Sequence, residues 1–244
     1  MDDTANKIIN WEIKPMRYNL LLLAFFISVP ILGQEYNSSK IALGFFYSPN
    51  LSYRNLSQND LVADFRDNTE VVKYGQSFGL VFLYRISHLL GLESGVNTQI
   101  RGFQTKLQDV IIAEPNPEIP DKIKTVDRFY YLGFPLKLTL YKNFKKISVI
   151  PAVGIIGNVL LHQDILFIGK TGEQTDVRKT VHTNDYRSFI ITSIVGFGIN
   201  WNISESIDLM ITPTFQYDIV PVMDAPLNTN LWDLGINFGC LFNL

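Results

Sequence analysis

The sequence predicts an all-β protein, an eight-stranded antiparallel up-and-down transmembrane β-barrel that follows an N-terminal signal peptide. Three observations support this fold class. Eight segments alternate large apolar residues with small or polar ones, short and long connections alternate along the chain, and an apolar run lies near the start. The net charge of -2, without any Lys/Arg-rich block, gives no reason to expect nucleic acid as a partner.

The signal peptide is predicted over residues 16–33. Arg17 precedes an apolar run at 20–32, and Gly33 supplies the small residue expected at a cleavage site. The run is too short for a good membrane helix, although a short membrane anchor is the alternative interpretation. We therefore expect an exported protein.

The residues on either side of this signal define the remaining organisation. Residues 1–15 have no export character, so we expect a disordered or wrongly assigned extension, with translation beginning at Met16. The barrel domain is then predicted over 34–244. Its only cysteine, Cys240, lies far from any lipoprotein acylation position and cannot form a disulfide within the chain.

The last segment shows the alternation most clearly. Apolar Trp232, Leu234, Ile236 and Phe238 alternate with Asp233, Gly235, Asn237 and Gly239. Successive residues of a strand point to opposite faces, so one face of this strand is apolar. The eight predicted strands occupy 41–48, 77–86, 90–97, 130–140, 149–161, 189–201, 207–217 and 232–244.

Connections between these strands are of two kinds. Tight turns are predicted near Ser87-His88, at 142–146 and at 202–206. Long, charged, Asn-rich or Pro-rich loops are predicted at about 55–73, 105–127, 163–187 and 218–231. This asymmetry is typical of bacterial outer-membrane barrels, so we expect the long loops outside the cell and the short turns in the periplasm.

A soluble eight-stranded barrel would show the same alternation with its apolar face inward. The second face of the sixth strand, from Ser188 to Asn200, carries no charge and would be a poor water-exposed surface. Small and polar residues instead suit a narrow barrel interior. The apolar row is therefore predicted to face lipid.

Aromatic residues near the strand ends support the same orientation, because such rings are favoured at both membrane interfaces. They fall into two predicted belts. The loop-end belt comprises Tyr53, Tyr130, Tyr217 and Trp232, and the turn-end belt comprises Tyr84, Trp201 and Phe242.

The segments Tyr131-Leu132-Gly133-Phe134-Pro135-Leu136-Lys137-Leu138 and Pro151-Ala152-Val153-Gly154 look like paired central strands of the PorT-like outer-membrane β-barrel family. Over about 40–244 the chain resembles this family, some members of which are implicated in protein secretion. The terminal strand, 232–244, looks like the signal that the outer-membrane assembly machinery reads, although it ends in Leu244 where an aromatic residue is commoner. The resemblance implies an outer-membrane location, contact with the assembly machinery and a secretion or envelope partner.

Four charged residues are predicted to point into the barrel and to form one ion-pair network: Arg85, Glu93, Arg101 and Lys137. Charges inside a barrel need partners, so we interpret this network as a structural plug, with a conduction pathway as the alternative.

A weaker pattern could carry catalysis. His162 is predicted to face inward at the loop end of the fifth strand, with Ser188 and Asp185 at the loop start of the sixth. A serine hydrolase needs these residue types to converge, but here no flanking motif accompanies them.

His88 and His182 are far apart in the sequence and no Gly-rich phosphate loop is present, so no metal site and no cofactor are predicted.

We therefore expect a non-enzymatic outer-membrane protein that contacts lipid and a partner protein in the cell envelope or in a secretion or assembly complex. A lipid-modifying hydrolase, a narrow channel and a surface adhesin are the alternatives.

Overall fold

The computed structural model describes residues 40–56, 68–111, 119–172, 174–182, 186–223 and 229–244. The chain divides into two units, 1–34 and 35–244, and all the described residues belong to the second. The extension predicted at 1–15 and the signal peptide predicted at 16–33 lie outside the described residues. No described helix has the length and apolarity needed to cross a membrane.

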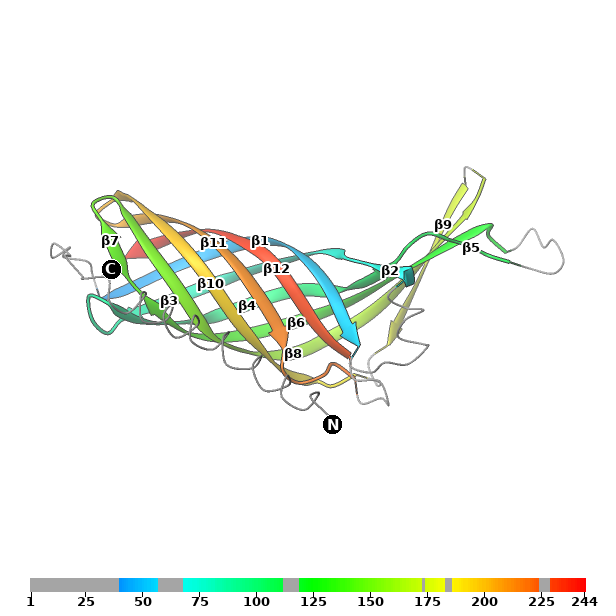
Figure 1. The fold of residues 1–244 in the computed structure, drawn as a ribbon, viewed down its shortest axis with the longest axis horizontal. Helices are drawn as coiled ribbons and strands as arrows, with labels where there is room; N and C mark the ends of the chain where they lie inside the picture. Colours follow the sequence, from blue (N-terminus) through cyan, green and yellow to red (C-terminus); the bar gives the residue numbers. More distant parts are fainter. Residues whose placement is uncertain (1–39, 57–67, 112–118, 173, 183–185, 224–228) are drawn as a thin grey trace, which may run out of the picture. The chain divides into compact units, whose positions relative to one another are not determined.

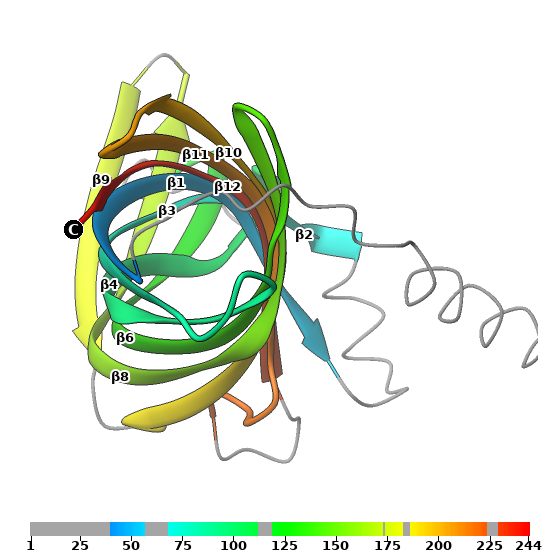
Figure 2. The same cartoon turned by 90° about the vertical axis from the view of Figure 1, so that its left-hand side faces the viewer.

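Eight long antiparallel strands close into a ring (Figures 1 and 2). Their bounds are β1 Ile41–Leu56, β3 Lys73–Arg85, β4 Leu90–Thr105, β6 Lys122–Leu140, β8 Ile147–Thr171, β10 Phe189–Ser204, β11 Ile207–Asp218 and β12 Thr229–Asn243. The first and last strands pair along their full length, from Ala42 opposite Asn243 to Leu56 opposite Thr229. This pairing leaves no open edge in the ring, and the predicted eight-stranded barrel is confirmed.

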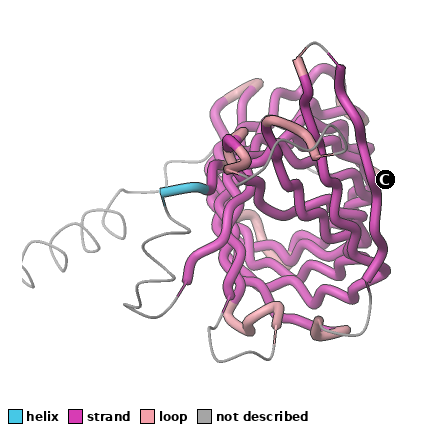
Figure 3. The backbone as a smooth tube through the Cα atoms, turned by 90° about the vertical axis from the view of Figure 1, so that its right-hand side faces the viewer, coloured by secondary structure: helices cyan, strands magenta, loops and turns pink. Residues whose placement is uncertain are grey.

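Four short strands extend this ring without changing it. Their bounds are β2 Glu70–Val71, β5 Gln108–Asp109, β7 Lys142–Phe144 and β9 Gln174–His182. The first pairs with β4, the second with β6, and the other two with β8. Seen from the opposite end, the tube consists almost wholly of strand (Figure 3).

The alternation places side chains as the sequence predicts. Inward Ala42 and Leu83 are buried, whereas outward Phe78 and Leu80 are 55% and 56% exposed. The same contrast holds at the terminal strand, where Leu241 is buried and Phe238 is exposed. A barrel with this exterior buries its large apolar residues only when hydrocarbon surrounds it.

The tight turns are confirmed. In the first, the backbone N–H groups of Ile86 and Ser87 both donate to the Leu90 carbonyl at 2.9 Å. The second turn is shorter than predicted and consists of Lys145 and Lys146, because β7 pairs with β8 up to Phe144 opposite Ile147. The third turn is also shorter and consists of residues 205–206.

The long loop predicted at 163–187 is wrong for most of its length. Residues 163–171 continue β8 and pair with β9, so this part of the chain is a β-hairpin that projects past the neighbouring strands (Figure 1). Charged residues indicated a loop, but charges are compatible with strands that water bathes on both faces. The loop predicted at 105–127 is also shorter than expected, because β6 begins at Lys122.

Candidate functional site

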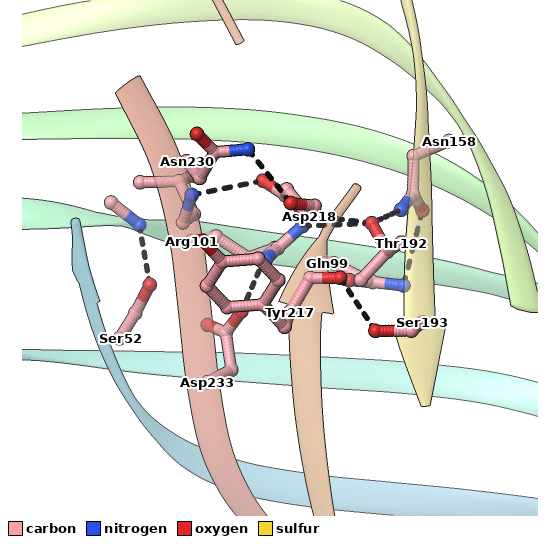
Figure 4. Close-up of polar contacts among 12 residues, drawn as sticks. Ser52, Gln99, Arg101, Asn158, Thr192, Ser193, Tyr217, Asp218, Asn230 and Asp233 are labelled. Carbon is pink, nitrogen blue, oxygen red and sulfur yellow. Dashed lines mark hydrogen bonds and ion pairs between the residues drawn. The ribbon is translucent and has the colours of Figure 1, made fainter. Parts of the chain in front are cut away.

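The most distinctive feature of the barrel interior is a fully buried arginine in its loop-end half (Figure 4). Arg101, on β4, has no exposed surface. Its Nε atom donates to Asp233 at 2.5 Å and one terminal nitrogen donates to Asp218 at 2.8 Å. Both carboxylates come from strands on the far side of the ring, β12 and β11, so this arginine connects opposite walls of the barrel.

Neutral polar side chains extend the Arg101 network toward β8 and β10. Thr192 donates to Asp218 at 2.7 Å and accepts from Asn158 at 2.7 Å. The amide of Gln99 donates to the Asn158 side-chain oxygen at 3.3 Å. A chain of hydrogen bonds therefore crosses the interior, as Figure 4 shows.

Strand β12 also holds this site in place. The Leu231 backbone N–H donates to the second carboxylate oxygen of Asp218 at 3.2 Å, and the side-chain amide of Asn230 donates to the Asp218 backbone carbonyl at 2.8 Å. These contacts leave Asp218 fully buried but hydrogen-bonded, as a charge in a low-dielectric interior requires.

A buried lysine lies on the same inward face as the Arg101 network. One guanidinium faces two carboxylates, which leaves one negative charge. Buried Lys73 lies opposite Ser52 in the β1–β3 ladder, and Ser52 lies opposite Asp233 in the next ladder. All three side chains share the inward face, so Lys73 supplies positive charge on the Asp233 side.

An apolar cluster lies beside the polar network at the loop end. Phe129 has no exposed surface, and its ring lies 5.1 Å edge-on from that of Tyr186. The chain after β11 contributes Val222 to the same cluster. This apolar layer separates the Arg101 network from water at that end.

A second ion pair lies in the turn-end half of the interior. Glu93 and Lys137 are directly opposite in the β4–β6 ladder and form a salt bridge. They line a cavity of about 20 Å³, which has room for one or two water molecules. An apolar cluster lies in the same half, with Phe46, Leu83 and Met210 among its members.

Arg85 lies nearer the turns and belongs to neither of these sites. It donates to the Asn243 side chain at 3.1 Å and lies 3.8 Å from the carboxylate of Asp208. The four residues predicted to form one network therefore occupy three separate places. Sequence reasoning missed the acidic partners of both arginines.

Those missed partners carried a sequence signal. Asp208, Asp218 and Asp233 all occupy the inward rows that the alternation defines. Contacts across the interior also depend on which strands face one another and how they are staggered, and single strands do not reveal this.

The aromatic residues of the predicted belts lie on the outward face. At the loop end, Trp232 lies opposite both Tyr53 and Tyr217 in the two ladders that flank β12. Its ring centroid is 6.0 Å from that of Tyr53. At the turn end, Tyr84, Trp201 and Phe242 are exposed.

The predicted inward orientation of His162 is wrong. The register of β6 and β8 shifts between Tyr130 and Tyr131, which places Tyr130 opposite His162 and Tyr131 opposite Leu160. The extra residue reverses the alternation beyond it. His162 consequently faces outward and stacks on the Tyr130 ring at 4.0 Å.

The candidate hydrolase residues are not brought together by any described contact. Ser188 is exposed, and the described part of the chain contains no hydrogen bond between it and His162. Asp185 lies outside the described residues. Within the described ranges, no three His, Cys, Asp or Glu side chains are grouped as a metal ion would require.

No protein-family model matches the chain, and no curated protein matches its sequence. Solved structures with a similar fold include Neisserial surface protein A, NspA, at 14% identity and a TM-score of 0.43, covering 85% of this chain and 99% of that one. The outer membrane protein OprG from Pseudomonas aeruginosa is 12% identical with a TM-score of 0.46, covering 85% and 98%. The outer membrane protease OmpT from Escherichia coli is 7% identical with a TM-score of 0.43, covering 88% and 100%.

These likenesses are too distant to carry a functional argument. The closed ring and its apolar exterior define the class: an eight-stranded transmembrane β-barrel.

Proposed function

We propose that the chain is a non-enzymatic outer-membrane protein that serves as a structural or interaction component of the cell envelope, or of a secretion or assembly complex. The observation that carries this proposal is the combination of a lipid-compatible exterior with an interior closed by packed and paired side chains. Such a barrel is a rigid membrane anchor for whatever its ends contact. Its long connections then face the outside of the cell and its turns face the periplasm.

The interior supports a plug more than a conduction pathway. Arg101, Asp218 and Asp233 bridge opposite walls, and the cavity beside Lys137 holds at most a few waters. Conduction would require this network to break, which would leave buried charges without partners. We therefore expect the purified protein to show no conductance above that of a bare lipid bilayer.

The projecting hairpin of β8 and β9 supports an interaction role. Residues 164–171 and 174–181 extend the barrel wall beyond the strands of its other half. Partner-binding residues are concentrated in exposed connections that a rigid scaffold positions. A protein partner in the envelope is therefore expected to contact this hairpin.

Membrane location is tested by separating cell envelopes on a density gradient. The proposal predicts that the protein sediments with outer-membrane marker proteins and resists extraction by high salt. Recovery of the intact chain in the soluble fraction would overturn it.

The interaction role is tested by purification from native membranes in mild detergent, followed by identification of co-purifying proteins. A matched variant removes residues 166–179 and joins Ile165 to Thr180, which are directly opposite in the hairpin, through a two-residue turn. The proposal predicts that a partner co-purifies with the native chain and is lost from this variant. A barrel that emerges alone in both preparations contradicts it.

A further inference from the structure

The outward face of the barrel wall changes character where β6, β8 and β9 continue past the loop-end aromatic belt. Tyr130 lies opposite His162, and two residues further along β6, Arg128 lies opposite Asp164. Directly opposite residues in antiparallel strands share a face. Arg128 and Asp164 therefore lie on the outward face of the wall. In the membrane-spanning part of the barrel, this same face carries the exposed apolar row.

Asp164 holds two cations in place on this outward face. Arg128 donates to its carboxylate through Nε at 2.6 Å and through a terminal nitrogen at 2.9 Å. Lys179, from β9, lies 3.1 Å from the same carboxylate. The Asp164 side chain has no exposed surface, whereas those of Arg128 and Lys179 are 27% and 50% exposed. The carboxylate thus fixes two cations that still present one side to the surroundings.

Further cations continue along the same face of the extension. Lys124 lies two residues beyond Val126, and Lys122 lies opposite Lys170. Together with Arg128 and Lys179 they make five cations, against two acids on the described part of this face, Asp164 and Asp109. Aliphatic residues lie between them: Val126, Leu166, Ile168 and Val177.

We propose that this cationic face, centred on Arg128 and Lys179, binds the phosphate group of a lipid headgroup in the outer leaflet. The inference rests on the proposed membrane location. Phosphates lie immediately outside the hydrocarbon layer, at the level just beyond an aromatic belt, and Tyr130 belongs to that predicted belt. Guanidinium and ammonium groups are the usual protein ligands of phosphate.

Three features favour a lipid phosphate over a soluble one. The site faces the same side as the lipid-facing row, and its aliphatic neighbours suit acyl chains or a sugar face better than free ions. The stacked rings of Tyr130 and His162 also lie next to the site, on its membrane side, and the Arg128 guanidinium is 5.8 Å from the Tyr130 ring centroid. The site is thus continuous with the apolar exterior of the barrel.

The hairpin provides a matched control. Arg178 is adjacent to Lys179 but lies on the opposite face of the strand, where it pairs with Asp176 at 3.0 Å. Lys145, in a turn at the other end of the barrel, is also exposed. The double substitution Arg178→Gln with Lys145→Gln removes the same charge as Arg128→Gln with Lys179→Gln, but leaves the proposed site intact.

The test uses the full chain, folded in dodecylmaltoside, with bis-phosphorylated lipid A as the probe. Native mass spectrometry gives the Kd, and the shifted mobility of unheated samples on SDS gels verifies folding. Arg128→Gln with Lys179→Gln is expected to weaken lipid A binding at least tenfold, and the control pair less than twofold. Lys179→Gln alone, which leaves the bidentate Arg128–Asp164 pair in place, is expected to weaken it about threefold and serves if the double variant does not fold.

Unchanged binding in the site variants, or equal weakening in the control, would overturn the proposal. Competition by inorganic pyrophosphate at the same concentration as lipid A would also overturn it, because the site would then select soluble anions. Flotation of the native chain with phosphatidylcholine liposomes is measured in parallel. Failure to float contradicts the proposed membrane location, whereas flotation with variant-insensitive lipid A binding contradicts the lipid site alone.

Discussion

The two halves of the barrel interior use charge in different ways. In the turn-end half, Glu93 and Lys137 pair between adjacent strands beside an apolar cluster. In the loop-end half, Arg101 reaches across the ring to Asp218 and Asp233. The first arrangement joins two strands that backbone hydrogen bonds already hold together. The second joins β4 to β11 and β12, which are not neighbours of β4 in the sheet.

This difference assigns the two sites different roles. An adjacent-strand pair adds to a ladder that would form without it, so its removal is a local loss. A pair that spans the interior fixes the shape of the ring and fills its centre with paired charges. The loop-end network should therefore contribute more to stability than the turn-end pair.

The largest effect is expected from Arg101→Met. It leaves two buried carboxylates without their cation, and breaking a buried pair in this way costs about 4 kcal/mol. Urea unfolding in phosphatidylcholine liposomes, followed by tryptophan fluorescence, measures the change. Adding Asp218→Asn and Asp233→Asn to the same chain should restore more than half of the loss. A loss below about 1 kcal/mol for Arg101→Met would remove the distinction between the two halves.

Lys137→Met should have a smaller effect, about 2 to 3 kcal/mol, because it strands Glu93 in a half-apolar layer where both side chains keep slight exposure. The same unfolding measurement applies. Combining it with Glu93→Gln should recover most of the stability, since no charge is then left unpaired. If Lys137→Met costs more than Arg101→Met, the order of importance proposed for the two sites is reversed.

Gly133→Ala probes a layer of buried amide side chains, Asn97, Gln99 and Asn158, which are joined by hydrogen bonds next to Gly133. A Cβ atom here would lie 2.2 Å from the Asn97 side-chain oxygen and 2.7 Å from that of Asn158. Overpacking of this kind costs about 1 to 2 kcal/mol after the amides shift. Gly172→Ala, at a hairpin position with open space but a φ of 55°, is a useful comparison because its cost is backbone strain alone. An unfolding midpoint unchanged by Gly133→Ala would show that the amide layer is loosely packed.

The smallest effect is expected from Arg85→Gln. Its guanidinium lies 3.8 Å from the Asp208 carboxylate, which also accepts a hydrogen bond from the Asn202 side chain at 2.6 Å, so losing the ion pair should cost about 1 kcal/mol or less. Glutamine can retain a hydrogen bond to Asn243. An effect as large as that of Arg101→Met would mean that the distance between the charges and the remaining hydrogen bond to Asp208 do not limit the loss.

The sequence supported the barrel and one of its interior contacts. Period-two alternation predicts the inward rows and puts Glu93 and Lys137 in one inward network, and the structure pairs these two across adjacent strands. Arg101 was placed on the inward face, but its partners lie on the far wall. Their identity depends on ring closure and stagger, which no local pattern encodes.

Two further differences between the sequence prediction and the structure have local causes. The bulge that turns His162 outward is a single extra residue near Leu161, and the alternation on either side of it looks regular. The hairpin formed by residues 163–171 and 174–182 is rich in charge, and this composition predicts a loop. Strands outside the bilayer lack the apolar row that identified the others, so their pattern is weaker.

The central claim is that the bulky outward row faces hydrocarbon. In a chain carrying Cys240→Ser, a spin label at Ile211→Cys reports on this directly, because Ile211 is half-exposed in the middle of β11 between Ile199 and Phe238. In phosphatidylcholine liposomes, the label should collide more with oxygen than with water-soluble nickel chelate, and a label at exposed Lys170→Cys should show the opposite. Greater access of the nickel chelate to position 211 would contradict the account.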